Sequence, residues 1–409
     1  MTGTAKKING SLEMPEKNIE RPIAPAIHKC RILVIDDDEL IRSFISLFLD
    51  RAGFCNIEFA ENGAKGLEKV ESFNPDIVLL DVQMPEMDGF EVLRRLRADP
   101  RHQDLPIFME TALDSLEDRN RALAEGATNL INKPIDGDVL ITGIRLQLEN
   151  RMLMGQLKAY RHRLDQELSS AQAMQHELMP SPDAVGDIET RYGISLQSHY
   201  RTSSELGGDF WGLSPLDDDR FSVFNVDFSG HGVSAAINTF RLHTLMKERK
   251  LSPSSTPSEH MAELNRHLAT LMPIGQFATM FFGIVDIGAD KVVYSGAAAP
   301  SPLLMTPGTD EPVLLDASGL PLGISKSASY KDKVIDFPAG SSLFLFSDAL
   351  FESPDKNGDI LQLDNVPGLV SDSLKDSDGS NPLPRILTRF YDKATLPLDD
   401  DLTAVWLSR

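Results

Sequence analysis

The sequence predicts a multidomain protein with a doubly wound parallel α/β domain, a helical connecting segment and an α+β domain. Three observations support this prediction. Near-continuous apolar strands alternate with amphipathic helices over residues 30–137. Residues 138–179 contain little glycine or proline and repeat apolar side chains at helical spacing. Residues 183–409 change to short strands, frequent turns and a few helices, a texture typical of packed sheets flanked by helices.

Composition restricts the classes of function. The chain has 409 residues, 41% of them hydrophobic, and a formal net charge of -21. This acidity argues against a nucleic-acid-binding surface, which needs clustered lysine and arginine. The apolar windows are too short and interrupted to span a bilayer, so we expect no membrane partner. Two cysteines, Cys30 and Cys55, give no disulfide framework and favour a reducing cytoplasm. Residues 1–29 lack periodicity and are expected to form a disordered arm.

The first domain is defined by its alternation of strands and helices. Buried strands are predicted over 31–36, 75–81, 105–111 and 127–132. Amphipathic helices are predicted over 39–53, 89–99 and 115–126. Because these strands are almost continuously apolar, both faces of their sheet must be covered, as in a doubly wound parallel sheet.

The connecting segment has the spacing of a coiled-coil seam. The steps between its apolar positions are mostly alternating threes and fours, with two successive fours that form a stutter. The seam positions are Leu153, Leu157, Tyr160, Leu164, Leu168, Ala171, Gln175 and Leu178. We therefore expect a connector helix that forms a homodimer. The alternative is a single amphipathic helix packed on a domain.

The last domain contains five predicted strands and two predicted helices. The strands cover 221–227, 278–287, 291–297, 341–348 and 402–408. The helices cover 233–250 and 257–272. The many short strands predict two packed sheets, and the helices are expected to flank them.

Polar side chains follow the strands of the first domain. Asp36 and Asp37 lie at the end of the strand predicted over 31–36, Asp81 ends 75–81, Thr111 ends 105–111 and Lys133 follows 127–132. The carboxyl ends of parallel strands meet at one edge of the sheet, so these groups are expected to converge. Converging carboxylates repel unless a cation neutralises them, and an all-oxygen site suits Mg²⁺. Hydroxyl and ammonium donors beside that cation predict a phosphoryl pocket.

This arrangement resembles the receiver domain of two-component response regulators, which has a flavodoxin-like fold. The resemblance implies that Asp81 is the phosphoacceptor and attacks phosphorus as a carboxylate nucleophile. It also implies a sensor histidine kinase as partner.

The resemblance further assigns roles around Asp81. Asp36 and Asp37 would bind Mg²⁺ together with Asp81 and the backbone carbonyl of Gln83. Thr111 and Lys133 would hold the phosphoryl oxygens.

A second set of acids lies beside the apolar strands of the last domain. Asp209 follows two glycines, Asp227 and Asp348 are predicted to end strands, and 399–401 precede the final strand. Burying several carboxylates together is unfavourable without counter-ions. These motifs offer no histidine or cysteine partner, so a hard divalent cation such as Mg²⁺ or Mn²⁺ is expected.

From residue 171 to the C-terminus the chain resembles the PPM (type 2C) family of metal-dependent Ser/Thr protein phosphatases, in its SpoIIE-like and RsbU-like branch. The resemblance rests on "AMQHELMP", "LGGDF", "DFSGHGVSAA", "FATMFFG", "LPLGI", "LFSDALFE" and "DDLT". It implies a β-sandwich flanked by helices and two Mg²⁺ or Mn²⁺ ions, whose bridging water attacks the phosphorus of a phosphoserine or phosphothreonine.

Within that family pattern, Asp227 would bridge the two ions and Phe228 would contribute its backbone carbonyl. Asp209 would bind in the metal shell, directly or through water, and Asp348 and Asp400 would complete the ligand set. Asp209 and Asp227 are therefore the predicted catalytic residues.

Two residues beside these ligands leave alternatives open. Asp401 is adjacent to Asp400 and could share its role. His231 could act as a general acid or metal ligand, although its flanking glycines favour a role in shaping a tight loop.

The chain departs from the family patterns at three places. Receiver domains usually carry an aromatic switch residue at the position of Leu130. The phosphatase family's Ala-Gly-His segment is Ala297, Ala298 and Ala299 here, and the glycine after Asp348 is Ala349. None of these changes removes a predicted ligand.

The order of the segments implies a signalling enzyme in which receiver phosphorylation controls a phosphatase. By resemblance, its substrate would be a phosphorylated STAS-type anti-sigma-factor antagonist in a stress-response partner switch. The alternative is an adaptor with a weak or inactive phosphatase-like domain that binds a sigma-factor regulator in a phosphorylation-dependent way.

Overall fold

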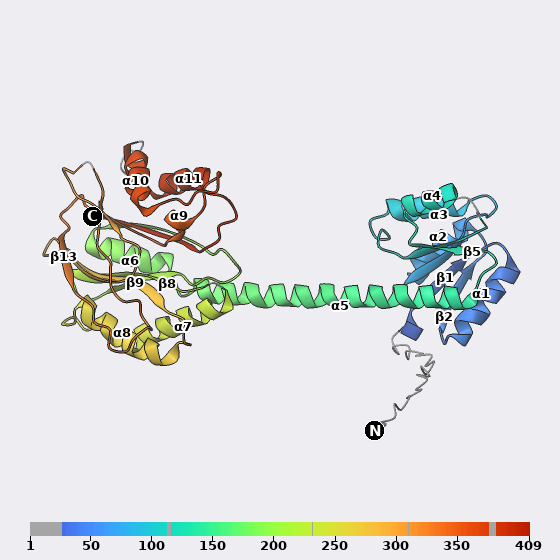
Figure 1. The fold of residues 1–409 in the computed structure, drawn as a ribbon, viewed down its shortest axis with the longest axis horizontal. Coiled ribbons are helices and arrows are strands. Elements are labelled where there is room, and N and C mark those ends of the chain that lie inside the picture. The colour runs from blue at the N-terminus through green and yellow to red at the C-terminus, as the bar shows by residue number, and fades with distance from the viewer. Residues whose placement is uncertain (1–26, 113–115, 231, 310, 376–381) are drawn as a thin grey trace, which may run out of the picture. The chain divides into compact units, whose positions relative to one another are not determined.

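A computed structural model describes residues 27–112, 116–230, 232–309, 311–375 and 382–409. The chain divides into two compact units, Met1–His162 and Arg163–Arg409, which we describe separately. Figure 1 labels their helices and strands.

The first unit is built on a parallel five-stranded sheet with the strand order β2-β1-β3-β4-β5. Its strands are β1 (Arg31–Ile35), β2 (Asn56–Ala60), β3 (Ile77–Asp81), β4 (Ile107–Thr111) and β5 (Asn129–Asn132). Its helices are α1 (Glu39–Arg51), α2 (Gly63–Phe73), α3 (Gly89–Ala98), α4 (Leu116–Ala124) and the start of α5 (Gly137–His176). The predicted doubly wound fold is confirmed. Strand β2 is the half-buried edge strand, and its weak apolar pattern explains why the sequence does not define it.

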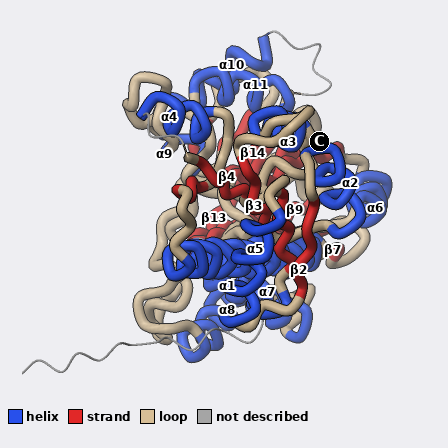
Figure 2. Tube along the Cα trace, turned by 90° about the vertical axis from the view of Figure 1, so that its right-hand side faces the viewer, coloured by secondary structure: helices blue, strands red, loops and turns tan. Residues whose placement is uncertain are grey.

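Each face of this sheet has its own core. Side chains of α1 and α5, such as Ile45 and Ile144, pack on one face. Side chains of α2 and α3, such as Val70 and Leu93, pack on the other. In Figure 2, α1 and α5 accordingly lie on one side of β3 and β4 and α3 lies on the other. The sheet is therefore covered on both faces. The carboxyl ends of its strands are left uncovered and can form a site.

Two predicted boundaries differ from the structure. Residues 1–26 lie outside the described residues, but Ile27–Lys29 form a 3-10 turn and Ile27 is buried in the first unit's core. The expectation of a disordered arm over 1–29 is therefore wrong for these three residues. The predicted linker, 138–179, also starts too early. Leu140, Ile144 and Leu148 recur every four residues on α5 and pack into the same core, because that spacing aligns them on one helix face.

The middle of α5 exposes a row of large apolar side chains. Leu153, Leu157, Tyr160 and Leu164 are each between 41% and 64% exposed. They belong to the predicted coiled-coil seam, and pairing with a second helix stays a prediction. Gln175 differs from these positions because its side chain is only 1% exposed and hydrogen-bonds to Gly207 within the second unit.

The second unit contains two five-stranded sheets. One has the order β13-β10-β9-β8-β7 and the other β12-β11-β14-β15-β6, with antiparallel pairing throughout. The first sheet contains β7 (Phe210–Pro215), β8 (Arg220–Phe228), β9 (Ala278–Asp286), β10 (Lys291–Ala297) and β13 (Lys333–Asp336). The second contains β6 (Ser195–Arg201), β11 (Leu303–Met305), β12 (Val313–Leu314), β14 (Ser342–Phe346) and β15 (Leu402–Ser408).

Helices cover the outer faces of this sandwich. Phe221 and Phe281 of one sheet and Leu345 of the other belong to the core between the sheets. A second core lies under α7 (Val233–Glu248) and α8 (Pro257–Leu271), and a third lies under α10 (Val366–Lys375) and α11 (Leu383–Lys393). Shorter helices are α6 (Pro182–Tyr192), α9 (Ala349–Glu352) and the 3-10 turn η2 (Leu363–Asn365). The predicted α+β sandwich is confirmed.

In the parts of the chain that the structure describes, no helix combines the length and apolar character needed to cross a bilayer.

Two candidate functional sites

The first candidate site lies where the parallel strands end. Asp36 follows β1, Asp81 is the last residue of β3, Thr111 is the last of β4 and Lys133 follows β5. Lys133 Nζ lies 2.9 Å from Asp36 Oδ2 and 2.9 Å from Asp81 Oδ1. The Asp38 backbone N–H donates to Asp36 Oδ1 at 2.7 Å and orients that carboxylate. Lys133 thus joins the ends of three strands through two buried acids.

Three acids at this edge are close enough to share a cation. Carboxylate oxygens of Asp36, Asp37 and Asp81 all lie within 4.8 Å of one another. Asp36 and Asp81 are buried and Asp37 is exposed. Lys133 supplies one positive charge against three negative ones, so the donor set fits an additional hard cation such as Mg²⁺. Gln83, whose carbonyl is a predicted ligand, lies two residues after Asp81 and is exposed.

Burial and charge act in opposite directions on these groups. Burial raises the pKa of Asp81 above its usual range, although its hydrogen bond with Lys133 lowers that pKa in part. Burial also tends to lower the pKa of Lys133, but the hydrogen bonds with Asp36 and Asp81 raise it overall. Lys133 is therefore held in its charged form beside the predicted phosphoacceptor.

Glu110 is a further acid of this site that the sequence motifs do not mark. Glu110 pairs with Asp81 across β3 and β4, and its side chain is completely buried. Neither of its carboxyl oxygens has a hydrogen-bond partner among the described residues. Burial and then the charge of Asp36 raise the pKa of Glu110 to about 8. In the sequence, Glu110 is marked only by its position as an acid next to the end of an apolar strand, one residue before Thr111.

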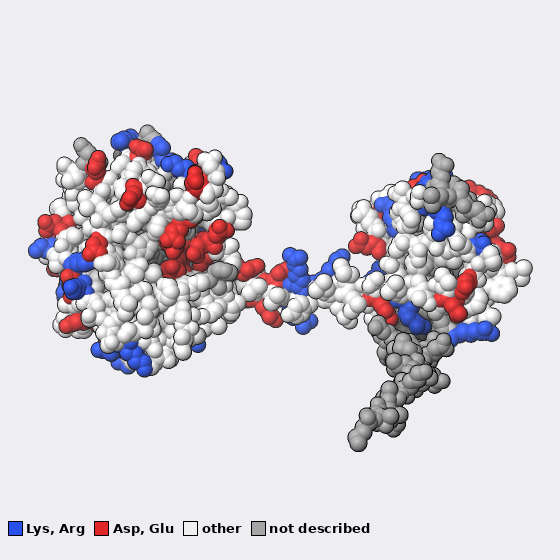
Figure 3. All heavy atoms as spheres, in the orientation of Figure 1, with Lys and Arg blue, Asp and Glu red and all other residues white. Residues whose placement is uncertain are grey.

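The second candidate site lies at one end of the sandwich and collects acids from both sheets. Asp227 is the penultimate residue of β8, Asp348 is the N-cap of α9 just after β14, and Asp400 is two residues before β15. Asp209 immediately precedes β7. In Figure 3 a large group of acidic side chains gathers on this unit, in the region where Figure 1 draws β8 and α9.

Contacts between neighbouring loops hold this site together. Asp209 is 1% exposed, and Thr403 Oγ1 donates to its Oδ2 at 2.8 Å. A side chain on Gly208 would place its Cβ 2.7 Å from the Phe228 carbonyl oxygen, so a glycine is needed there. The Phe228 carbonyl, a predicted ligand, therefore lies directly against the loop that carries Asp209.

Burial and neighbouring acids raise the pKa values of three of these acids. Burial, followed by the charges of Asp348 and Asp400, raises the pKa of Asp227 to about 8. Burial and then the charge of Asp400 raise the pKa of Asp348 to about 6. Burial, Asp227 and Asp401 raise the pKa of Asp209 well above its usual range. Among the described residues, no lysine or arginine is a main cause of these three shifts. Hard divalent cations fit such a set of oxygen donors.

The acids of the second site are more widely spread than those of the first. In the described chain, no three of Asp209, Asp227, Asp348 and Asp400 bring carboxylate oxygens within 4.8 Å of one another. The set is therefore not one compact single-ion cluster.

Asp401 binds the loop that leads to Asp209. Its Oδ1 accepts from the Ser203 backbone N–H at 2.7 Å, and its Oδ2 accepts from the Gly208 N–H at 2.6 Å. Both carboxylate oxygens thus bind the loop that leads to Asp209. This geometry favours a positioning role for Asp401 over the shared-ligand alternative.

Four further residues from the sequence motifs lie at or near the two sites or outside the described residues. His231 lies outside the described residues, while its neighbours Gly230 and Gly232 have φ values of 85° and 77°, which favour glycine. Ala298 has φ 55° where the family pattern has glycine. Leu130 packs against one of the receiver cores, and Ala349 is buried at the start of α9.

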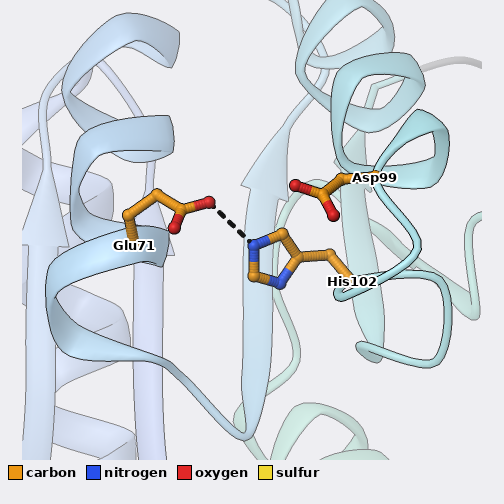
Figure 4. A group of neighbouring side chains, drawn as sticks. All are labelled: Glu71, Asp99 and His102. Carbon is orange, nitrogen blue, oxygen red and sulfur yellow. Dashed lines mark hydrogen bonds and ion pairs between the residues drawn. The ribbon is translucent and has the colours of Figure 1, made fainter.

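A third group, Glu71, Asp99 and His102, could also hold a metal by distance alone. Figure 4 shows Glu71 on α2 facing His102, with His102 Nε2 3.0 Å from Glu71 Oε1. Arg101 already forms ion pairs with Glu71 at 2.9 Å and with Asp99 at 2.6 Å. We therefore interpret this group as an ion-pair cluster that ties α2 to the segment after α3.

The fold defines a signalling class of protein: a receiver-type α/β domain in the same chain as a phosphatase-type α+β sandwich. Family models agree with this class. The response regulator receiver domain matches residues 32–145, and the stage II sporulation protein E (SpoIIE) family matches residues 217–409. The chain thus contains a response regulator receiver domain followed by a SpoIIE-type PPM phosphatase domain. Asp209 precedes the matched segment.

Individual relatives resemble parts of this chain. The chain is 28% identical over 229 residues to the DNA-binding dual master transcriptional regulator RpaA of Synechocystis, covering 55% of this chain and 87% of RpaA. It is 28% identical over 163 residues to the phosphoserine phosphatase RsbP of Bacillus subtilis, covering 39% of this chain but only 40% of RsbP. The SiaA-PP2C domain of Pseudomonas aeruginosa shares the fold, with a TM-score of 0.52 and 17% identity over 61% of this chain and 99% of that domain.

Proposed function

We propose that phosphorylation of Asp81 controls a metal-dependent Ser/Thr protein phosphatase in the C-terminal unit. One observation carries the phosphatase part of this proposal. Burial and neighbouring acids raise the pKa values of Asp209, Asp227 and Asp348, with no described lysine or arginine among the main causes. Such a cluster is unfavourable on its own and becomes favourable when divalent cations bind.

In this proposal Asp227, Asp209, Asp348 and Asp400, with the Phe228 carbonyl, hold two Mg²⁺ or Mn²⁺ ions. When bound, such ions supply an activated water and neutralise phosphoryl charge. The chain's own residues hold the Asp209 carboxylate in position. Thr403 and the Gly207–Gly208 loop, which Asp401 fixes, keep the Asp209 carboxylate in place.

In the receiver, the Asp81 carboxylate would attack the phosphoryl group of a sensor histidine kinase, and the bond from phosphorus to the kinase's histidine nitrogen would break. Asp36, Asp37 and the Gln83 carbonyl would hold Mg²⁺ beside Asp81. Lys133 already contacts Asp81 at 2.9 Å and, with Thr111, would hold the transferred oxygens.

Helix α5 would transmit the signal. Its exposed apolar row supports a homodimer, and its far end reaches the phosphatase loop through Gln175. We place the protein in the cytoplasm, where its free cysteines, Cys30 and Cys55, would stay reduced. Its substrate would be a phosphorylated STAS-type anti-sigma-factor antagonist in a stress-response partner switch, as the likeness to RsbP suggests.

Hydrolysis of p-nitrophenyl phosphate tests the enzyme. The purified full chain should hydrolyse it with Mn²⁺ and stop in EDTA, and Asp348→Asn should lose at least tenfold in rate because a predicted ligand is weakened. Asp336→Asn, an exposed acid on β13, is the matched control and should retain full activity. Equal Mn²⁺-dependent rates in all three proteins would refute the assignment of this site.

The adaptor alternative is favoured by the alanines at 297–299 and by Ala349, where the family pattern has other residues. It predicts no metal-dependent hydrolysis of p-nitrophenyl phosphate. It also predicts that beryllofluoride, an aspartyl-phosphate mimic, changes capture of the antagonist without changing turnover. Under the phosphatase proposal, beryllofluoride should change turnover.

A further inference from the structure

A cavity of about 560 Å³ opens on the second unit, away from the acidic site. Its lining comes from the turn after α5 (including Met179) and the start of α6, from strands β7, β8 and β9, from the end of α7 and from α8. The volume lies within the range of small-molecule sites in proteins.

The floor of the cavity is aromatic. Phe224 and Phe282 lie nearly parallel, with an angle of 6° between their rings and 6.2 Å between centroids. The His260 ring lies 5.0 Å from Phe282. Gly212 also lines the cavity, and a side chain there would place its Cβ 2.5 Å from the Phe224 ring. This glycine therefore allows Phe224 to occupy its place in the floor. Such a surface suits a flat, apolar ring system.

A buried polar side chain in this floor lacks a partner. His260 is only 5% exposed, and its imidazole makes no hydrogen bond within the described chain; its nitrogens are not among the fully enclosed unpaired atoms, so they face the cavity. Buried polar groups are normally paired, so an unpaired one that lines a cavity points to a ligand atom. Ser222, 3% exposed, adds a hydroxyl to the same lining.

The mouth of the cavity is basic. Lys247, in the last turn of α7, and Lys250, two residues after the helix, line it, and neither forms an ion pair with an acid among the described residues. His243 lies one turn before Lys247 and also lines the cavity. Glu177 is the one acid of the lining that the structure describes. The unpaired charge is therefore positive, in a protein whose formal net charge is -21.

We propose that this cavity binds a small aromatic anion. The flat ring system would lie on Phe224 and Phe282, within reach of His260. The carboxylate or sulfonate would face Lys247 and Lys250. This inference does not depend on the proposed phosphatase activity, because it concerns a different set of residues and a binding equilibrium.

Calorimetric titration of the full chain with 1-naphthoate and with 1-naphthamide tests this proposal. The two probes share the same bicyclic body, and only the first is charged. We expect one naphthoate per chain and affinity for naphthamide at least tenfold lower. The double variant Lys247→Gln/Lys250→Gln should weaken naphthoate binding about tenfold and leave naphthamide unchanged.

Matched variants separate the site from general charge effects. Lys291→Gln/Lys326→Gln removes two exposed lysines outside the cavity lining and should bind naphthoate like the wild type. His260→Phe keeps an aromatic ring but removes the imidazole nitrogens, and should weaken naphthoate binding several-fold; circular dichroism melting verifies its folding.

Three binding results would overturn the proposal: no naphthoate binding at millimolar concentration, equal affinity for both probes, or an equal loss of naphthoate affinity in the Lys247→Gln/Lys250→Gln and Lys291→Gln/Lys326→Gln variants. A change of oligomeric state in Lys247→Gln/Lys250→Gln, seen by sedimentation, would instead assign the cavity to a second copy of the chain and also reject the proposal.

Discussion

Gln175 and Gly207 are joined by hydrogen bonds in both directions. Gln175 Nε2 donates to the Gly207 carbonyl at 2.6 Å, and the Gly207 N–H donates to Gln175 Oε1 at 3.1 Å. The same amide nitrogen also lies 3.3 Å from Thr239 Oγ1 on α7. One buried side chain near the end of α5 therefore binds both the loop before Asp209 and the helix that follows the Asp227 loop.

Replacing Gln175 with leucine should damage the metal site. Leucine is similar in size but leaves the Gly207 N–H and C=O unpaired in a buried place, at a cost of about 1–3 kcal/mol in the free energy of unfolding. Because Gly208 and Asp209 follow directly, we also expect the Mn²⁺ concentration for half-maximal p-nitrophenyl phosphate hydrolysis to rise several-fold.

Gln172→Leu is the control for this change, because Gln172 lies one turn earlier on α5 and is exposed. Urea unfolding and Mn²⁺ titration measure the two effects. If Gln175→Leu loses stability but keeps its Mn²⁺ requirement, the amide only anchors the helix.

Replacing Asp227 with asparagine should stabilise the metal-free protein and abolish its response to metal. The change removes a carboxylate whose pKa is raised to about 8 by burial and by neighbouring acids. In EDTA at pH 8 we therefore expect a higher melting temperature for the second unit than in the wild type. Added Mn²⁺ should raise the melting temperature of the wild type but not that of Asp227→Asn. A lower melting temperature in EDTA for the variant would contradict this electrostatic explanation.

The strand-end acids could be predicted because each stands in a short motif beside an apolar strand. Asp81 and Lys133, 52 positions apart by their numbers, could be expected to meet because parallel strands share an edge. Glu110 could not be recognised in the same way, since its importance depends on pairing with Asp81 across β3 and β4.

For Gln175 and Asp401, the local sequence pattern predicts a different role from the one that the structure shows. Gln175 has the spacing of the coiled-coil seam, so the sequence assigns it to a partner helix. The structure buries it against Gly207 instead, because a long-range loop supplies both hydrogen bonds. Asp401 resembles a ligand in sequence, yet both its oxygens accept backbone N–H groups that lie about 200 residues earlier.

Replacing Glu110 with glutamine should change how receiver stability depends on pH. The pKa of Glu110 is about 8 in the folded state, above its unfolded value near 4.5. Its contribution is therefore most favourable below pH 4.5 and is lost as the pH rises toward 8. Relative to wild type, Glu110→Gln should become increasingly stabilised between pH 5 and pH 8, by a few kcal/mol at most, since one pKa unit is about 1.4 kcal/mol.

Hydrogen exchange of β3 and β4 in the full chain, without Mg²⁺, measures this difference. Glu68→Gln, an exposed acid on α2, is the control and should follow the wild type. A constant offset between Glu110→Gln and wild type across this pH range would show that Glu110 does not titrate there.

Replacing Ala298 with glycine should stabilise the second unit. Ala298 adopts φ 55°, where a Cβ is unfavourable and glycine is not. Relief of this strain should raise the free energy of unfolding by about 0.5–1 kcal/mol in urea titrations. Ala299→Gly, one residue on and outside the positive-φ region, should lower it instead. If Ala298→Gly lowered the free energy of unfolding, local packing and not backbone conformation would decide at this turn.

Breaking the apolar row of α5 tests the predicted dimer. Leu157 and Leu164 are 58% and 41% exposed in the single chain, so polar substitutions there should cost the isolated chain little. If the row is a dimer seam, Leu157→Asn/Leu164→Asn removes two apolar contacts per helix and should shift sedimentation from dimer to monomer at micromolar concentration. Ala159→Asn/Gln166→Asn places the same side chains on the opposite side of the helix and should remain dimeric. Equal sedimentation of all three proteins would exclude this row as the dimer contact, leaving the alternative of a single helix.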